Sequence, residues 1–185
     1  MSPILGIYAS QISGHLWEPA GAYDALWSTT LASATSTITI SNIPQTYKHL
    51  QIRYIGRNSV NNSVIKITLN SDTAANYSLH YLYGNGSTVT SGGAASQSNM
   101  EANMAVSSYA ASVFGGGVMD LLDYANTNKY KTLRVLNGFD NNSAGQVTFS
   151  SGSWRNTNAV TSITLIPNSS GNFEQYSSFA LYGIN

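Results

Sequence analysis

The chain has 185 residues, of which 42% are hydrophobic and only 9% are charged, and its eight basic and eight acidic side chains leave no net charge. This length fits one domain with a buried core, while the charge balance excludes a highly charged disordered tail, a basic nucleic-acid-binding surface and a coiled coil. The absence of cysteine excludes a disulfide scaffold and a thiolate metal site, and the apolar runs are too short to cross a membrane.

Residues 1–30 predict an irregular, apolar N-terminal arm. No lysine or arginine precedes Lys48, which argues against the basic start of a secretory signal, and several glycines and prolines interrupt any regular element. Such an arm has to bury its apolar side chains on its own domain or on another chain. The residues that we expect to make those contacts are Ile4, Leu5, Ile7, Leu16, Trp17 and Trp27.

Residues 31–185 predict a single all-β domain. Apolar residues alternate with polar ones, and clusters of Gly, Asn, Ser or Pro bound each run, as turns between strands require. Residues 100–114 fit either a strand or a helix, and we favour a strand. The other strands are expected at 35–41, 47–55, 64–69, 77–83, 118–124, 130–136, 146–150, 160–166 and 176–184.

Three short patterns recur in the same order and predict two similar halves, at about 35–85 and 117–185. The second half then carries an insertion near 138–155. Two similar antiparallel halves favour a jelly-roll-like β-sandwich over the alternative, an immunoglobulin-like sandwich. The recurring patterns are 47–52 with 130–135, 64–69 with 160–165, and 77–84 with 176–183.

The sequence offers little for catalysis, and we expect no enzyme and no cofactor. The three histidines (His15, His49 and His80) have no metal-ligand spacing, and we expect the last two to point outward from strands. Asp72 and the 140–142 run (Asp-Asn-Asn) are typical of turn capping, with a calcium site as the weaker alternative for the second. No nucleophile elbow or P-loop is present.

Glycine runs and basic residues are given structural interpretations. Residues 84–87 and 115–117 are glycine-rich and predict turns or flexible loops. Arg53 and Arg57, and likewise Lys129 and Lys131, are expected at the rim of the domain or at subunit contacts. Abundant Ser, Thr and Asn, together with twenty aromatic residues, suit either flat subunit interfaces or a sugar-binding face.

Five stretches together resemble a family of tailed-bacteriophage virion structural proteins, and they span nearly the whole chain. They are 2–7 (Ser-Pro-Ile-Leu-Gly-Ile), 43–53 (Ile-Pro-Gln-Thr-Tyr-Lys-His-Leu-Gln-Ile-Arg), 70–78 with its Asn-Ser-Asp and Asn-Tyr-Ser, 122–132 (Leu-Asp-Tyr-Ala-Asn-Thr-Asn-Lys-Tyr-Lys-Thr) and 176–184 (Tyr-Ser-Ser-Phe-Ala-Leu-Tyr-Gly-Ile). The resemblance brings no catalytic residues.

The resemblance implies a part of the virion, made in the host cytoplasm. Our first hypothesis is a capsid decoration or cement protein on the outer capsid surface. It would form a homotrimer and bind the major capsid protein, with no nucleic acid or membrane as partner. The alternative is a tail-fibre or baseplate module that binds a host glycan, which would need an exposed aromatic shelf flanked by Asn or Asp. An enzyme such as a polysaccharide depolymerase is the third hypothesis, against which the sparse carboxylates argue.

Overall fold

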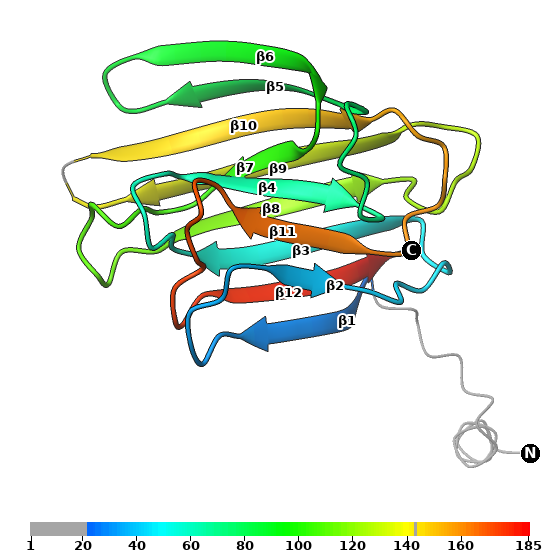
Figure 1. Ribbon diagram of the computed structural model, residues 1–185, viewed down its shortest axis with the longest axis horizontal. Coiled ribbons are helices and arrows are strands. Elements are labelled where there is room, and N and C mark those ends of the chain that lie inside the picture. The colour runs from blue at the N-terminus through cyan, green and yellow to red at the C-terminus, as the bar shows by residue number, and fades with distance from the viewer. Residues whose placement is uncertain (1–21, 143) are drawn as a thin grey trace, which may run out of the picture.

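The computed structural model describes residues 22–142 and 144–185 and shows an all-β fold there (Figure 1). Its strands in this part of the chain are β1 (Tyr23–Thr30), β2 (Ile38–Ile40), β3 (His49–Gly56), β4 (Val64–Leu69), β5 (Tyr77–Gly84), β6 (Val89–Gln97), β7 (Met100–Asn103), β8 (Gly115–Leu122), β9 (Lys131–Asp140), β10 (Gly145–Trp154), β11 (Ile163–Pro167) and β12 (Ser178–Ile184). Nine of the expected strands and the start of 100–114 are present, whereas β1 and β6 are additions. No helix in these residues is long and apolar enough to span a membrane.

The strands form two antiparallel sheets of unequal width. The large sheet has the order β1-β12-β3-β8-β9-β10-β5-β6, and the small sheet has the order β2-β11-β4-β7. Figure 1 shows the small sheet in front of the middle of the large one, so that β5 and β6 extend beyond its edge. The predicted antiparallel β-sandwich is confirmed. Because the sheets differ in width, part of the large sheet has no partner layer.

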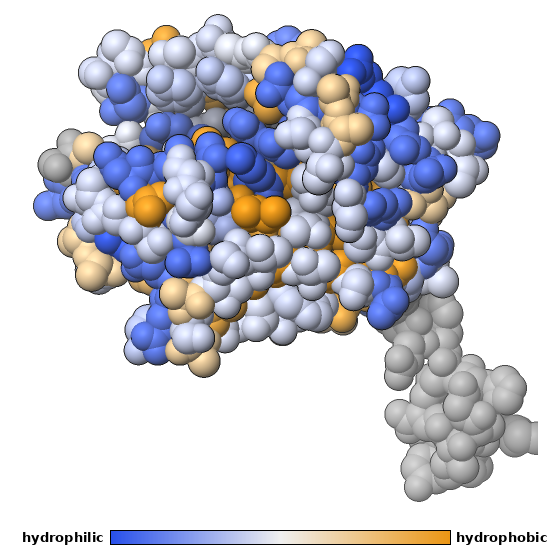
Figure 2. All heavy atoms as spheres, in the orientation of Figure 1, coloured by the Kyte–Doolittle hydropathy of each residue, from blue (hydrophilic) through white to orange (hydrophobic). Residues whose placement is uncertain are grey.

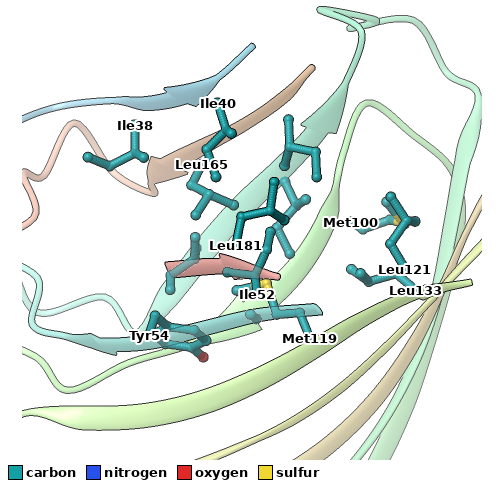
Figure 3. Close-up of a cluster of buried hydrophobic side chains, with 14 of the residues drawn as sticks. Ile38, Ile40, Ile52, Tyr54, Met100, Met119, Leu121, Leu133, Leu165 and Leu181 are labelled. Atoms are coloured by element: carbon teal, nitrogen blue, oxygen red, sulfur yellow. The ribbon is translucent and has the colours of Figure 1, made fainter. Parts of the chain in front are cut away.

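The core lies between the two sheets and follows the alternation of the strands. Leu50, Ile52 and Tyr54 point inward from β3, and Ile65 and Ile67 do so from β4, each at most 3% exposed. Figure 3 shows how side chains from both layers meet there. Each fully buried aliphatic or aromatic side chain contributes about 1.5–3 kcal/mol to the stability of such a core.

The predicted N-terminal arm is too long, because its last part belongs to the sandwich. Residues 23–30 form β1, which pairs with the C-terminal strand, Tyr23 opposite Ile184 and Thr30 opposite Ser178. The glycines and prolines that suggested irregular structure all precede this stretch. Trp27, expected to pack on its own domain or on another chain, lies in β1 and packs against the domain's own core. The domain therefore begins at about residue 23.

The strand order has an approximate two-fold symmetry. It exchanges β5 with β12 and β6 with β1 in the large sheet, and β4 with β11 in the small sheet. Thr68 of β4 faces Thr164 of β11, and these two residues occupy the same position in the 64–69 and 160–165 patterns. Two of the three sequence recurrences thus occupy equivalent places. The first recurrence does not, because the equivalent of β3 is β10 and not β9.

The triple glycine at 115–117 is a strand and not the predicted loop. It begins β8, where Gly117 lies opposite Tyr54 of β3. A Cβ at Gly117 would lie 2.5 Å from the Tyr54 ring, and one at Gly115 would lie 2.8 Å from the backbone nitrogen of Ala105. Glycine is required here because a neighbouring ring and a neighbouring backbone approach the strand closely.

Arg57 is buried instead of lying at the rim as expected. It is 3% exposed and all five of its N–H groups donate. The Nε donates to Glu174 Oε2 (2.9 Å), and Nη1 and Nη2 donate to four backbone carbonyls of the 105–114 loop, those of Ser107, Tyr109, Ala110 and Val113. The guanidinium therefore holds the 105–114 loop, whose β pairing among the described residues is an isolated bridge between Ala105 and Arg57.

Lys131 is also buried, with no exposed surface, contrary to the expectation of a rim position. It shares the inward face of β9 with Leu133 and Val135. Its Nζ donates to the backbone carbonyls of Asn126, Lys129 (2.9 Å) and Thr157 (3.0 Å), which joins two loops at one end of the sandwich. Burial lowers the pKa of this ammonium group.

Candidate functional site

The turn roles expected of the aspartates are present. Asp72 Oδ1 accepts from the backbone N–H of Ala74, and its Oδ2 accepts from Asn76 and from Trp154 Nε1 (2.7 Å). Asp140 Oδ1 accepts from the backbone N–H of Asn142 (2.7 Å). The 140–142 run thus has the turn geometry that we favoured over a calcium site.

The described residues bring together no group of three His, Asp or Glu that could hold a metal ion. His49 Nδ1 accepts from the backbone N–H of Asp123 (3.0 Å) and lies 3.7 Å from its carboxylate. A hydrogen bond from Lys129 (2.7 Å) lowers the pKa of Asp123. His80 is exposed on β5, as expected. These groups stabilise loops and strand ends.

Of the expected contact residues, only Trp27 lies within the described part. Ile4, Leu5, Ile7, Leu16 and Trp17 lie outside the described residues. The structure instead provides two surfaces that the sequence analysis did not identify. One is on the outer face of the large sheet, and the other lies where β5 and β6 extend beyond the small sheet.

The first surface is an apolar area on the uncovered side of the large sheet, which we call the apolar face. Its members are side by side in the strand register, where Val118 faces Leu136, Leu136 faces Phe149 and Phe149 faces Leu82. Most of these side chains are half exposed or more, which is unusual for several large apolar residues in one place. The apolar face consists of Ile55, Leu82, Val118, Leu136, Val147 and Phe149.

A shallow depression of about 380 Å³ lies within the apolar face. Gly116 and Gly138 face each other across β8 and β9 and form its floor, while Leu136 and Val147 stand beside it. No charged side chain lines it. A depression with glycine at the bottom and aliphatic walls fits an apolar side chain of another polypeptide.

Polar side chains border the apolar face on the side of β3 and β12. Arg53 lies over the rings of Tyr23 and Tyr182, 5.1 Å and 4.9 Å from their centroids. Its Nε donates to Gln51 Oε1 (2.7 Å), and Gln51 in turn donates to Asp120 Oδ1 (2.8 Å). An apolar centre next to a polar rim is the usual arrangement of a protein–protein interface. Arg53 lies inside the large sheet and not at the rim of the domain, and its expected subunit contact stays a prediction.

The second surface is a groove of about 290 Å³ between β5 and β10 on one side and β7 on the other. Tyr81 and Tyr83 line it from β5, with ring centroids 6.2 Å apart and planes at 26°. The polar groups of Glu101 and Asn103 lie opposite on β7, and Gln146 lines the groove from β10. Figure 2 shows the molecule hollowed beneath the β5–β6 hairpin on this side, among mainly hydrophilic residues.

Comparisons with known proteins leave the family open. Neither the family models, nor the curated proteins, nor the solved structures give a match to this chain.

Proposed function

We propose that the chain is a structural protein of a tailed-bacteriophage virion that decorates the capsid. It acts as a homotrimer that binds the major capsid protein on the outer surface of the head. The observation that supports it best is the apolar face, because an exposed group of aliphatic and aromatic residues beside a polar rim is the mark of an assembly interface. The five stretches that resemble virion structural proteins point the same way.

The N-terminal segment is the occupant that we propose for the apolar face, supplied by the next subunit in the trimer. Residues 1–21 carry Ile4, Leu5, Ile7, Leu16 and Trp17, no lysine or arginine and one carboxylate, Glu18, so their mainly apolar chemistry matches an uncharged apolar surface. They precede β1, an edge strand of the same sheet. At most about 3.5 Å per residue, 21 residues reach about 70 Å, roughly twice the width of eight strands spaced about 4.8 Å apart. Such head-to-tail contacts close into a ring.

Decoration stabilises the capsid because binding of the protein is linked to assembly of the lattice. A protein that binds only the assembled lattice stabilises that lattice by its own binding free energy, and a trimer that spans several capsid subunits has to be released before they separate. No chemical step is needed. The mechanism requires only that apolar area be buried at the contacts, at about 25 cal/mol for each Å².

Immunogold labelling of intact virions with an antibody to this protein tests the proposal. We expect many gold particles over the head. A few particles confined to the tail would contradict decoration and favour the second candidate, a tail-fibre or baseplate module. The groove beside Tyr81 and Tyr83 is the observation that favours this candidate, because it supplies the aromatic shelf that glycan binding requires.

Binding of the purified protein to mature capsids tests the N-terminal segment. A variant without residues 1–21 keeps β1 and should fold, but we expect it to lose capsid binding. A deletion of residues 1–27 is a poor choice, because it removes more than half of β1 and the core contact of Trp27. Undiminished binding of the shorter deletion to capsids would refute the role of this segment.

A further inference from the structure

The groove beside Tyr81 and Tyr83 has a preformed aromatic wall. Both side chains point to the same side of β5, and their rings are nearly parallel. Tyr81 is also 36% exposed. Its ring packs against Gly92 of β6, where a Cβ would lie 2.5 Å from the hydroxyl oxygen. The missing side chain at Gly92 therefore lets the tyrosine lie against the neighbouring strand, which fixes the ring before any ligand arrives.

The groove also carries fixed hydrogen-bonding groups on β7 and β10. Thr148 Oγ1 accepts from Gln146 Nε2 (2.7 Å) and from Asn103 Nδ2 (3.2 Å), so both amides are held in place. In the described part of the chain, their side-chain carbonyl oxygens accept no hydrogen bond and the carboxylate of Glu101 has no ion pair. These groups have acceptor oxygens and N–H donors available for a ligand.

A buried polar side chain next to the groove, that of Asn137, also lacks a hydrogen-bond partner. Asn137 lies opposite Thr148 on β9 and is 3% exposed. Both polar atoms of its side chain are without a hydrogen-bond partner among the described residues. Asn137 does not line the groove itself, but it adds an unpartnered amide next to Thr148, which does.

The charges of the groove restrict its ligand. No lysine, arginine or histidine lines it, and Glu101 carries the only carboxylate among its described lining residues. Lys66 faces Glu101 in the strand register but does not line the groove. Phosphate and other anionic ligands are therefore disfavoured. The volume of about 290 Å³ is at the lower end of the range for small-molecule sites, which suits a short ligand.

We propose that this groove binds a short neutral saccharide. The apolar C–H face of a pyranose ring packs on Tyr81 and Tyr83, while its hydroxyl groups donate to Glu101, Asn103 and Gln146 and accept from the two amides. Each hydroxyl both donates and accepts, as do the two amides. The proposal goes beyond the proposed decoration and deepens the second candidate function, because it names the class of ligand that the groove takes.

Saturation-transfer NMR and titration calorimetry with maltose, lactose, mannobiose and N,N′-diacetylchitobiose test the proposal on the full chain. We expect millimolar binding of at least one of them. Tyr81→Ala and Tyr83→Ala should each weaken it about tenfold, because each removes one ring of the stacking surface. Tyr81→Phe keeps the ring and should stay within about threefold of the wild type.

Tyr130→Ala is the matched control, since Tyr130 is 57% exposed but does not line the groove. It should bind as the wild type does. Thermal melts of all variants show whether each is folded, which we expect because Tyr81 is itself partly exposed. The proposal is overturned if none of the four saccharides binds, or if the two groove alanine variants bind as tightly as Tyr130→Ala.

Discussion

The buried guanidinium of Arg57 gives the sharpest prediction about stability. Arg57→Met keeps much of the side-chain volume but removes all five hydrogen bonds. Each of the four carbonyls that loses its donor costs about 1 kcal/mol, and the bond to the partly exposed Glu174 adds less than about 1 kcal/mol. We therefore expect a loss of about 4 kcal/mol in the free energy of unfolding. In a domain of this size, a loss of about 4 kcal/mol lowers the melting temperature by roughly 8–16 °C.

Urea denaturation and thermal circular dichroism measure this loss. Arg134→Met is the matched control, because the Arg134 side chain is 53% exposed and its pair with Asp120 is long, at 3.7 Å. An exposed pair of this kind contributes about 1 kcal/mol or less. The 105–114 loop should also become sensitive to proteases in Arg57→Met but not in the control. If the two variants lose equal stability, Arg57 does not hold the loop as described.

Two further predictions concern the glycine strand and an aspartate. Gly117→Ala should lower the free energy of unfolding by about 1–3 kcal/mol, because its Cβ meets the buried Tyr54 ring. The control is Gly116→Ala, whose Cβ has nothing nearer than 3.7 Å, so this variant should unfold at nearly the wild-type denaturant concentration. Equal effects of the two variants would contradict the packing. Burial raises the pKa of Asp72, but hydrogen bonds from Asn76, Trp154 and the backbone of Ala74 outweigh it and hold the pKa below the ordinary value of 3.8. The folded state thus gains stability above about pH 4 that is lost as the pH falls through the lowered pKa. Between pH 4 and pH 2, stability should fall more steeply in the wild type than in Asp72→Asn, and parallel curves would disprove this.

Alternation of apolar residues was enough to predict most of the strands. The 64–69 run became β4 with the expected bounds, because Ile65, Ile67 and Leu69 have to face one core. β6 gave no such signal. It contains two glycines, two alanines and three serines or threonines in Val89–Gln97, and it forms because Tyr81 and His80 pack against the two glycines. The side chains that pack on β6 belong to β5, so the residues of β6 alone could not predict a strand there.

The buried cations show where local reasoning failed. Lys131 was interpreted with Lys129 as a rim or subunit contact, although its spacing from Leu133 and Val135 put it on the inward face. That spacing was the usable signal. Arg57 had no such signal, since its partners lie 50 to 117 residues away in the chain.

The two candidate surfaces depend on tertiary structure. Leu82 is far in the sequence from Leu136 and Phe149, and the three become neighbours only when β5, β9 and β10 pair. The groove exists because the large sheet is wider than the small one. Composition suggested an interface or a sugar-binding face, but the residues that form either one could be named only from the strand order.

Sedimentation equilibrium of the full chain tests most directly the claim that the protein acts by assembling through the apolar face. We predict a mass three times the 19.7 kDa of one chain for the wild type. Leu136→Glu, which puts a charge in the centre of the apolar face, should sediment as a folded monomer. Thr132→Glu, on the outward face of the same strand but beyond the apolar face, should remain a trimer. A monomeric wild type, or a Leu136→Glu variant that still forms trimers, would contradict the account.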